Sequence, residues 1–246
     1  MKKILGFLLI IAISASVFMV RTWYEENKED DFFYRDTFDS LNKDFWYVGE
    51  WKTMFEADDK AILEDSKIKL VVNETDRGPF LLSKPLEIEK GDIISVKRKI
   101  KVMYNNNNFS GGFALLGTDE EEIRPKILED KWSRGLGNGI VLIEYVHNYL
   151  EESVRPGRDI FRVLPPTWDK YNNYEIIEPI FDEWFEEELI YNTEIGSIRY
   201  IINGTEYSVK GLPFTKKYIR IFTHSYGYYT GHSMEIDWVE IEIKRK

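Results

Sequence analysis

The stretch 92–104, DIISVKRKIKVMY, decides the fold class of this chain, because its apolar and basic residues alternate. Successive side chains of a β-strand point to opposite faces. The alternation therefore predicts a strand with one buried and one solvated face, as in an antiparallel sheet that is wet on one side. The buried face takes Ile94, Val96, Ile100 and Val102, and the solvated face takes Lys97, Lys99 and Lys101.

The same period of two recurs from Arg35 to the end, in short segments bounded by Gly, Asn, Asp and Pro. Asn203-Gly204 accepts the positive φ of a tight hairpin turn. Long amphipathic helices and fixed-period repeats are missing from the sequence, so we expect one all-β domain over 35–246, a two-sheet antiparallel jelly-roll sandwich. The long stretches 118–138 and 151–183 are interpreted as irregular loops. Further strands are predicted at 67–73, 111–116, 140–149, 185–192, 197–202, 206–210, 218–225 and 234–243.

Composition excludes several classes of protein. The 246 residues are 43% hydrophobic and 15% aromatic, which is ample for a packed core. A formal net charge of −10 repels phosphate backbones, so nucleic acid is not an expected partner. The absence of cysteine removes disulfides, thiolate metal sites and a lipid-modified cysteine.

The N-terminus carries an export or anchoring signal. Lys2 and Lys3 precede an apolar run from Ile4 to Val20, and Arg21 follows it. This length lies between that of a signal peptide and that of a membrane-spanning helix, so residues 1–24 are either a retained helical anchor or a cleaved signal. The positive residues keep the N-terminus inside. We expect a single-pass membrane protein with a charged spacer at 25–34 and an extracellular domain, or a secreted protein after cleavage.

Four local patterns resemble the concanavalin A-like lectins and glucanases, with laminarinases among them. They are the opening stretch 36–41 with Trp46, Gly49 and Trp51, the segment 81–92, the hairpin 184–204, and the closing stretch 236–239. The resemblance covers roughly 35–243 and implies a jelly-roll fold. The fold carries lectins, hydrolases, lyases and adhesive modules, so it does not fix an activity.

The catalytic pattern of the glucanase branch is missing. That branch places clustered carboxylates on a central strand of the concave sheet, and a retaining mechanism needs two of them about 5 Å apart. The corresponding strand, 140–149, has Glu144, but its i+2 position is Val146. A lyase would instead need Tyr or His as acid and base, and an Arg beside a uronate. If the chain is an enzyme, its candidate catalytic residues are Tyr145, His147, Glu144, His224 and Arg220.

Aromatic residues in the long loops and near Gly227 are candidates for ligand binding, because sugars stack their apolar faces on such rings. These are Trp132, Trp168, Tyr171, Tyr174, Tyr226, Tyr228 and Tyr229. No cofactor is expected. A structural calcium ion held by Asp39 and Asp237 is an alternative to plain ion pairing of these residues, because related sandwiches join their first and last strands in this way.

Three functions follow from these observations. The first is a non-catalytic, membrane-tethered module that binds carbohydrate or a cell-envelope polymer. The second is a polysaccharide lyase or an atypical glycoside hydrolase on the same fold. The third is a structural envelope protein that binds another protein through one face of a sheet.

Overall fold

The computed structural model describes residues 30–50, 60–73, 78–103, 109–122, 138–149, 158–164, 175–211, 213–227 and 233–246. Side chains at 109–110, 138, 146–149, 158–160, 164, 175–176 and 226–227 lie outside this description. The described chain consists of strands β1 to β16 in two antiparallel sheets, sheet A and sheet B. Its described residues contain no helix that is long and apolar enough to cross a membrane. The helix expected at 1–24 lies outside these residues.

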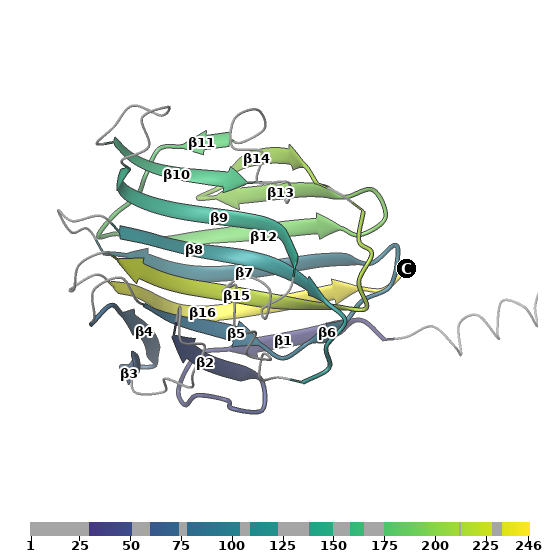
Figure 1. Ribbon diagram of the computed structural model, residues 1–246, viewed down its shortest axis with the longest axis horizontal. Coiled ribbons are helices and arrows are strands. Elements are labelled where there is room, and N and C mark those ends of the chain that lie inside the picture. The colour runs from purple at the N-terminus through teal and green to yellow at the C-terminus, as the bar shows by residue number, and fades with distance from the viewer. Residues whose placement is uncertain are drawn as a thin grey trace, which may run out of the picture.

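Sheet A holds both ends of the described chain. Its strands are β1 (Phe32–Asp36), β3 (Ala61–Glu64), β4 (Lys67–Val71), β7 (Ile93–Val102), β12 (Trp184–Asn192), β13 (Ser197–Ile202), β14 (Thr205–Lys210) and β16 (Ser233–Lys244). They follow the order β14-β13-β12-β7-β16-β4-β3, and β1 also pairs with β16. The first and last strands therefore lie side by side in the sheet (Figure 1).

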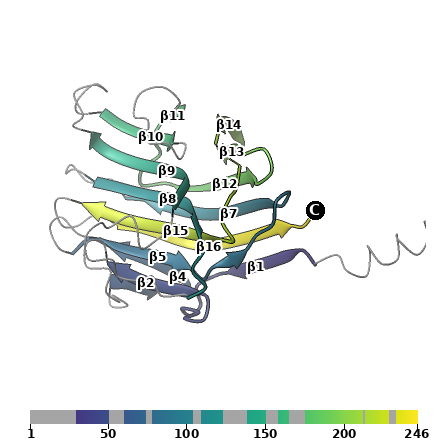
Figure 2. The same cartoon turned by 45° about the vertical axis from the view of Figure 1, so that its right-hand side comes forward.

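Sheet B forms the second layer of the sandwich. Its strands are β2 (Trp46–Glu50), β5 (Pro79–Ser83), β6 (Leu86–Glu87), β8 (Phe109–Thr118), β9 (Asn138–Tyr149), β10 (Arg158–Leu164), β11 (Glu175–Ile177) and β15 (Tyr218–Gly227). Their order is β11-β10-β9-β8-β15-β5-β2, and β6 also pairs with β15. Figure 2 shows the two sheets as separate layers, with β8, β9 and β15 in one and β7, β12 and β16 in the other.

The core lies between the sheets because alternate residues of the central strands are apolar. In β7 the buried residues alternate with half-buried lysines, as the sequence predicts. All nine predicted strands are present, although most bounds differ by one or two residues. The predicted hairpin turn joins β13 to β14, with φ of 46° at Asn203 and 82° at Gly204.

The interpretation of 151–183 as one irregular loop was wrong, because β10 and β11 lie within it. Phe161 and Val163 of β10 are fully buried, but charged residues and the following Pro165-Pro166 disguise the short alternation in the sequence. Strand pairing begins before Arg35, because Phe32 already pairs with Ile243 of β16.

A β-bulge at Asp237 keeps the whole of β16 in register with the core. Ile236 and Val239 are both buried, although strict alternation would turn one of them outward. The pairing between β16 and β7 shifts between Ile236 and Trp238, which leaves Asp237 as the extra residue. Asp237 and Trp238 consequently both lie at half-buried positions, not in the core.

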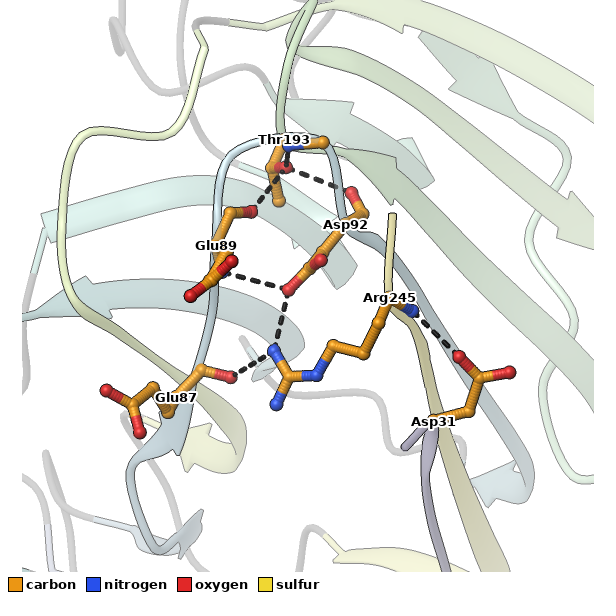
Figure 3. Close-up of polar contacts among 7 residues, drawn as sticks. Asp31, Glu87, Glu89, Asp92, Thr193 and Arg245 are labelled. Atoms are coloured by element: carbon orange, nitrogen blue, oxygen red, sulfur yellow. Dashed lines mark hydrogen bonds and ion pairs between the residues drawn. The ribbon is translucent and has the colours of Figure 1, made fainter. Parts of the chain in front are cut away.

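The penultimate residue Arg245 contacts two distant parts of the chain, the residue before β1 and the turn before β7 (Figure 3). Its backbone N–H donates to Asp31 before β1, and its Nη1 lies 2.7 Å from Asp92 Oδ2 and 3.1 Å from the Glu87 carbonyl. The Thr193 hydroxyl, after β12, lies 3.0 Å from the Asp92 carbonyl oxygen. The half-buried ion pair of Arg245 and Asp92 thus fixes the C-terminus to the turn that precedes β7.

Candidate functional site

The outer face of sheet B, which is turned away from sheet A, carries one row of side chains across neighbouring strands. Thr223 and Tyr145 contact Arg98 of sheet A, so the residues that precede and follow them in β15 and β9 face outward. The strand register then aligns residues of β2, β5, β15, β8, β9 and β10. This row consists of Gly49, Phe80, His224, Gly112, Glu144 and Arg162.

Aromatic rings lie flat on part of this face because two glycines leave room for them. A Cβ atom on Gly112 would come within 2.4 Å of His224 Cε1, and one on Gly49 within 2.2 Å of Phe80 Cζ. The ring of Phe222 stacks on His224 at a centroid distance of 5.2 Å and lies 5.4 Å from Phe80. We call Phe80, Phe222 and His224 the aromatic floor. All three are at least 94% buried.

An ion pair lies beside the aromatic floor. Arg162 Nε donates to Glu144 Oε2 at 2.5 Å, and the two side chains are 12% and 14% exposed. Charged hydrogen bonds of this kind are stronger than neutral ones and have a fixed geometry. Gly112 separates Glu144 from His224 in the row, so one polar pair and one imidazole share the same outer face.

His224 is neutral at physiological pH. Burial, together with the nearby charge of Arg98, lowers the pKa of its imidazole to about 3. On the same face, Arg220 donates to the carbonyl oxygen of Glu122, and burial lowers the pKa of its guanidinium. The structure therefore brings Glu144, His224 and Arg220 to one face, as strand alternation predicts for the last two.

Tyr145 is separated from these residues because it lies on the inner face of sheet B. It is fully buried, and its hydroxyl donates to Glu187 Oε2 at 2.5 Å. Burial raises the pKa of Tyr145 well above its ordinary value. A polymer outside the sandwich does not reach this hydroxyl. The backbone of His147 pairs with Phe109 at the end of β9, and its side chain lies outside the described atoms.

A buried polar network, which the sequence analysis missed, joins the two sheets around Tyr145. Arg98 of β7 donates to Glu187 of β12, to Thr223 at 2.6 Å and to Tyr145 at 2.8 Å. The hydroxyl of Tyr200 also donates to Glu187. A signal was present in the sequence, because Arg98 occupies an inward position between Val96 and Ile100. We consider this network structural, because it is sealed from solvent.

Among the described residues, Tyr226 is the one predicted binding aromatic, and it lies near one end of sheet B. Tyr226 pairs through its backbone with Ser110, two residues after His224 in β15, and its side chain is outside the described atoms. Strands β2, β9 and β15 end, and strands β8 and β10 begin, at this end of sheet B. The other predicted aromatics lie outside the described residues; they are Trp132, Trp168, Tyr171, Tyr174, Tyr228 and Tyr229.

The two carboxylates proposed for calcium have different partners. Asp39 accepts hydrogen bonds from Ser66 at 2.6 Å and Thr37 at 3.0 Å. Asp237 Oδ2 lies 2.8 Å from Lys99 Nζ. Within the ranges that the structure describes, no three His, Cys, Asp or Glu side chains come together as a metal site would require. The calcium site stays a prediction.

The fold resembles that of many solved proteins, although no family model and no curated protein matches the sequence. Peanut lectin has a TM-score of 0.64 at 10% identity, with 89% of this chain and 99% of that chain covered. The chain has a concanavalin A-like fold. The carbohydrate recognition domain of Emp47p aligns with a TM-score of 0.59 at 12% identity over 85% and 93% of the two chains.

An enzyme domain shares this concanavalin A-like fold. LamAcat from Zobellia galactanivorans aligns with a TM-score of 0.53 at 14% identity, over 85% of this chain and 96% of its own. Most of the similar structures are lectins or carbohydrate recognition domains. At these identities the likeness establishes the fold, and function has to be argued from side chains.

Proposed function

We propose that this protein is a non-catalytic carbohydrate-binding module that acts on the outside of the cell. The observation that carries the proposal is the ion pair of Glu144 and Arg162 beside the aromatic floor, on one face of a lectin-like sandwich. Sugars need apolar contact for their ring faces and fixed charged groups for their hydroxyls. The outer face of sheet B supplies the charged pair on rigid strands, and its aromatic floor is buried, so the apolar contacts have to come from other aromatic residues.

We propose that the predicted aromatics, including Trp168, Tyr171, Tyr174, Tyr228 and Tyr229, complete the site. A cell-envelope polymer or a free glycan fits this arrangement equally, since both present the same sugar chemistry.

The surroundings of Glu144 support binding over hydrolysis. A retaining glycosidase needs a second carboxylate about 5 Å away, and an inverting one about 6.5–9.5 Å away. In the row on the outer face of sheet B, the neighbours of Glu144 are Gly112 and Arg162, which are not acids. Glu144 already accepts a hydrogen bond from Arg162, and the same carboxylate can accept hydrogen bonds from ligand hydroxyls.

A glycan array with the full-length chain tests the proposal, together with assays for new reducing ends and unsaturated products. We expect binding without turnover. Glu144→Gln keeps the size of the side chain but removes its charge, so it should weaken binding by about tenfold or more. The matched control is Glu206→Gln, which removes the acid of an exposed ion pair with Arg199 in sheet A. Turnover, or equal binding by Glu144→Gln, would reject the proposal.

We also propose that residues 1–24 tether the module to the membrane, with the sandwich outside the cell. The motivation is the apolar run from Ile4 to Val20 between Lys3 and Arg21. In fractionated cells the chain should stay with membranes after washing at high salt, and protease added to intact cells should remove the sandwich. Release of the chain into the medium would instead support signal cleavage.

A further inference from the structure

A groove on the outer face of sheet A lies between two tryptophans. Its volume is about 440 Å³, within the range of small-molecule sites, about 300–1,000 Å³. The turn at Asn203-Gly204 borders it, and a Cβ atom on Gly204 would meet nothing within 4 Å. The side chains that form the groove come from β12, β7 and β16, and they include Trp184, Glu186, Glu188, Lys97, Lys99 and Trp238.

Strand register fixes the relative positions of these side chains. Trp184 pairs with Lys101 of β7, while Trp238 pairs with Lys99, two residues away on the same strand. The two tryptophans therefore lie on either side of β7, about 10 Å apart across the sheet and about 7 Å along it. This separation suits a ligand of two or three sugar rings better than a single ring.

Cations hold both indole rings in place at the groove. Lys99 Nζ lies 5.6 Å and Lys67 Nζ 5.8 Å from the centroid of the Trp184 ring. Arg35 Cζ lies 5.5 Å from the Trp238 ring. Such contacts restrict the orientation of the ring. The two aromatic surfaces are thus formed before any ligand arrives.

Each of the two lysines of the groove pairs with a carboxylate. Lys97 pairs with Glu188 at 3.7 Å, and Lys99 pairs with Asp237 at 2.8 Å. Glu188 also accepts a hydrogen bond of 2.7 Å from the Ser95 hydroxyl. A charged ligand would have to displace one of these partners and would meet a like charge nearby. Hydroxyl groups can instead donate to the carboxylates and accept from the ammonium groups while the ion pairs persist.

We propose that this groove is a second binding site, which takes a neutral oligosaccharide. The apolar faces of its sugar rings stack on Trp184 and Trp238, and its hydroxyls bond Glu186, Lys97 and Lys99. The site lies on the opposite side of the sandwich from the outer face of sheet B. The chain can therefore bind carbohydrate on two faces. Variants at one face should leave binding at the other face intact.

Affinity measurements on the full-length chain test this site. The probes are neutral gluco-, manno- and galacto-oligosaccharides of two to six rings, and uronate oligomers of the same lengths. We expect Trp184→Ala and Trp238→Ala each to weaken binding of a neutral oligomer by about tenfold in a Glu144→Gln background, which silences the outer face of sheet B. The conservative variant Trp184→Phe keeps a ring and should recover most of this loss.

Phe33→Ala is the matched control, because Phe33 is an aromatic residue of sheet A that is 61% exposed and does not line the groove. It should leave affinity unchanged. Binding should also change little between about 0.05 M and about 0.5 M salt, since the ligand is uncharged. The proposal fails if no neutral oligosaccharide binds the Glu144→Gln chain. It also fails if both tryptophan variants, still folded by circular dichroism, bind as tightly as Phe33→Ala.

Discussion

Arg98 of β7 and Glu187 of β12 form an ion pair in which neither side chain is exposed to solvent. They are direct neighbours in the register of sheet A, and both point into the space between the sheets. Arg98 reaches Thr223 and Tyr145 of sheet B, so the pair joins the two layers. Removal of one partner of such a pair leaves a buried charge without its counter-ion.

The first prediction concerns the loss of one partner of this pair. Glu187→Leu leaves the Arg98 charge buried without its counter-ion, and should lower the free energy of unfolding by about 3–5 kcal/mol. Arg98→Met combined with Glu187→Leu removes both charges, so the double variant should lose much less than the sum of the single losses. Urea denaturation of the four chains measures this. Additive losses would contradict the role assigned to the pair.

The second prediction is a loss of stability in acid that depends on His224. Its folded pKa of about 3 lies below its ordinary value of 6.5, because burial disfavours the charged ring. As the pH falls, His224 therefore takes up a proton in the unfolded chain at a higher pH than in the folded chain. The contribution of His224 is complete above about pH 6.5 and is lost toward about pH 3, by at most about 1.4 kcal/mol per pH unit.

Urea midpoints measured from pH 7 to pH 5 check this, because most carboxylates titrate below that range. The variant His224→Phe keeps a ring over Gly112 and removes the titration, so its stability should change less over the same interval. Parallel curves for the two chains would show that His224 is already solvated in the folded state.

The third prediction concerns the space above Gly112. Gly112→Ala places a Cβ atom against His224 Cε1 and against the carbonyl oxygen of Ile143, so it should destabilise the fold by about 1–3 kcal/mol. Combining it with His224→Ala removes one of the two clashes. In a His224→Ala background, Gly112→Ala should then lower stability less than it does in the parent chain, as measured by thermal denaturation. An unchanged cost would place the strain at Ile143 alone.

The fourth prediction concerns the bulge in β16. Deletion of Asp237 forces either Ile236 or the run from Val239 onward to turn away from the core, so the chain should lose cooperative unfolding. Asp237→Asn keeps the bulge and removes only a partly exposed ion pair, with an expected loss below about 1 kcal/mol. Circular dichroism and urea unfolding distinguish the two variants. A deletion variant that unfolds like the parent would refute this reading of the bulge.

The fifth prediction concerns two of the aromatic residues that the sequence indicates for ligand binding. Trp168→Ala and Tyr228→Ala should each weaken binding of the leading glycan by about tenfold, because each removes a stacking surface. Their unfolding free energy should change little if they act on the ligand and not on the core. Titration calorimetry and urea unfolding of the same samples separate these effects. A parallel loss of stability and affinity would assign them to packing.

Local sequence was sufficient for much of sheet A and for part of sheet B. The alternation in 92–104 places the lysines of β7 outside and its aliphatic residues inside, because side-chain direction in a strand depends only on position. The Asn203-Gly204 turn is equally local, since it depends on the backbone freedom of two residues. β10 escaped prediction because charged residues and the nearby prolines interrupt a short apolar pattern.

The candidate site was less accessible to sequence reasoning. Alternation alone puts His224 and Arg220 on one face, and Glu144 and Tyr145 on opposite faces of β9. It does not say which of these faces is the inner one. The ion pair of Glu144 with Arg162 was missed because Arg162 lies in the unrecognised β10.

The sequence by itself determined the all-β class, most strand positions, the tight hairpin and the resemblance to concanavalin A-like domains. Only the tertiary structure decided that Arg98 meets Glu187, that Tyr145 is sealed between the sheets, and that Trp184 and Trp238 face one groove. The physical reason is that alternation is a property of neighbouring residues, whereas these contacts depend on hydrogen-bond register between strands far apart in the chain. That register is set by the packing of two whole sheets.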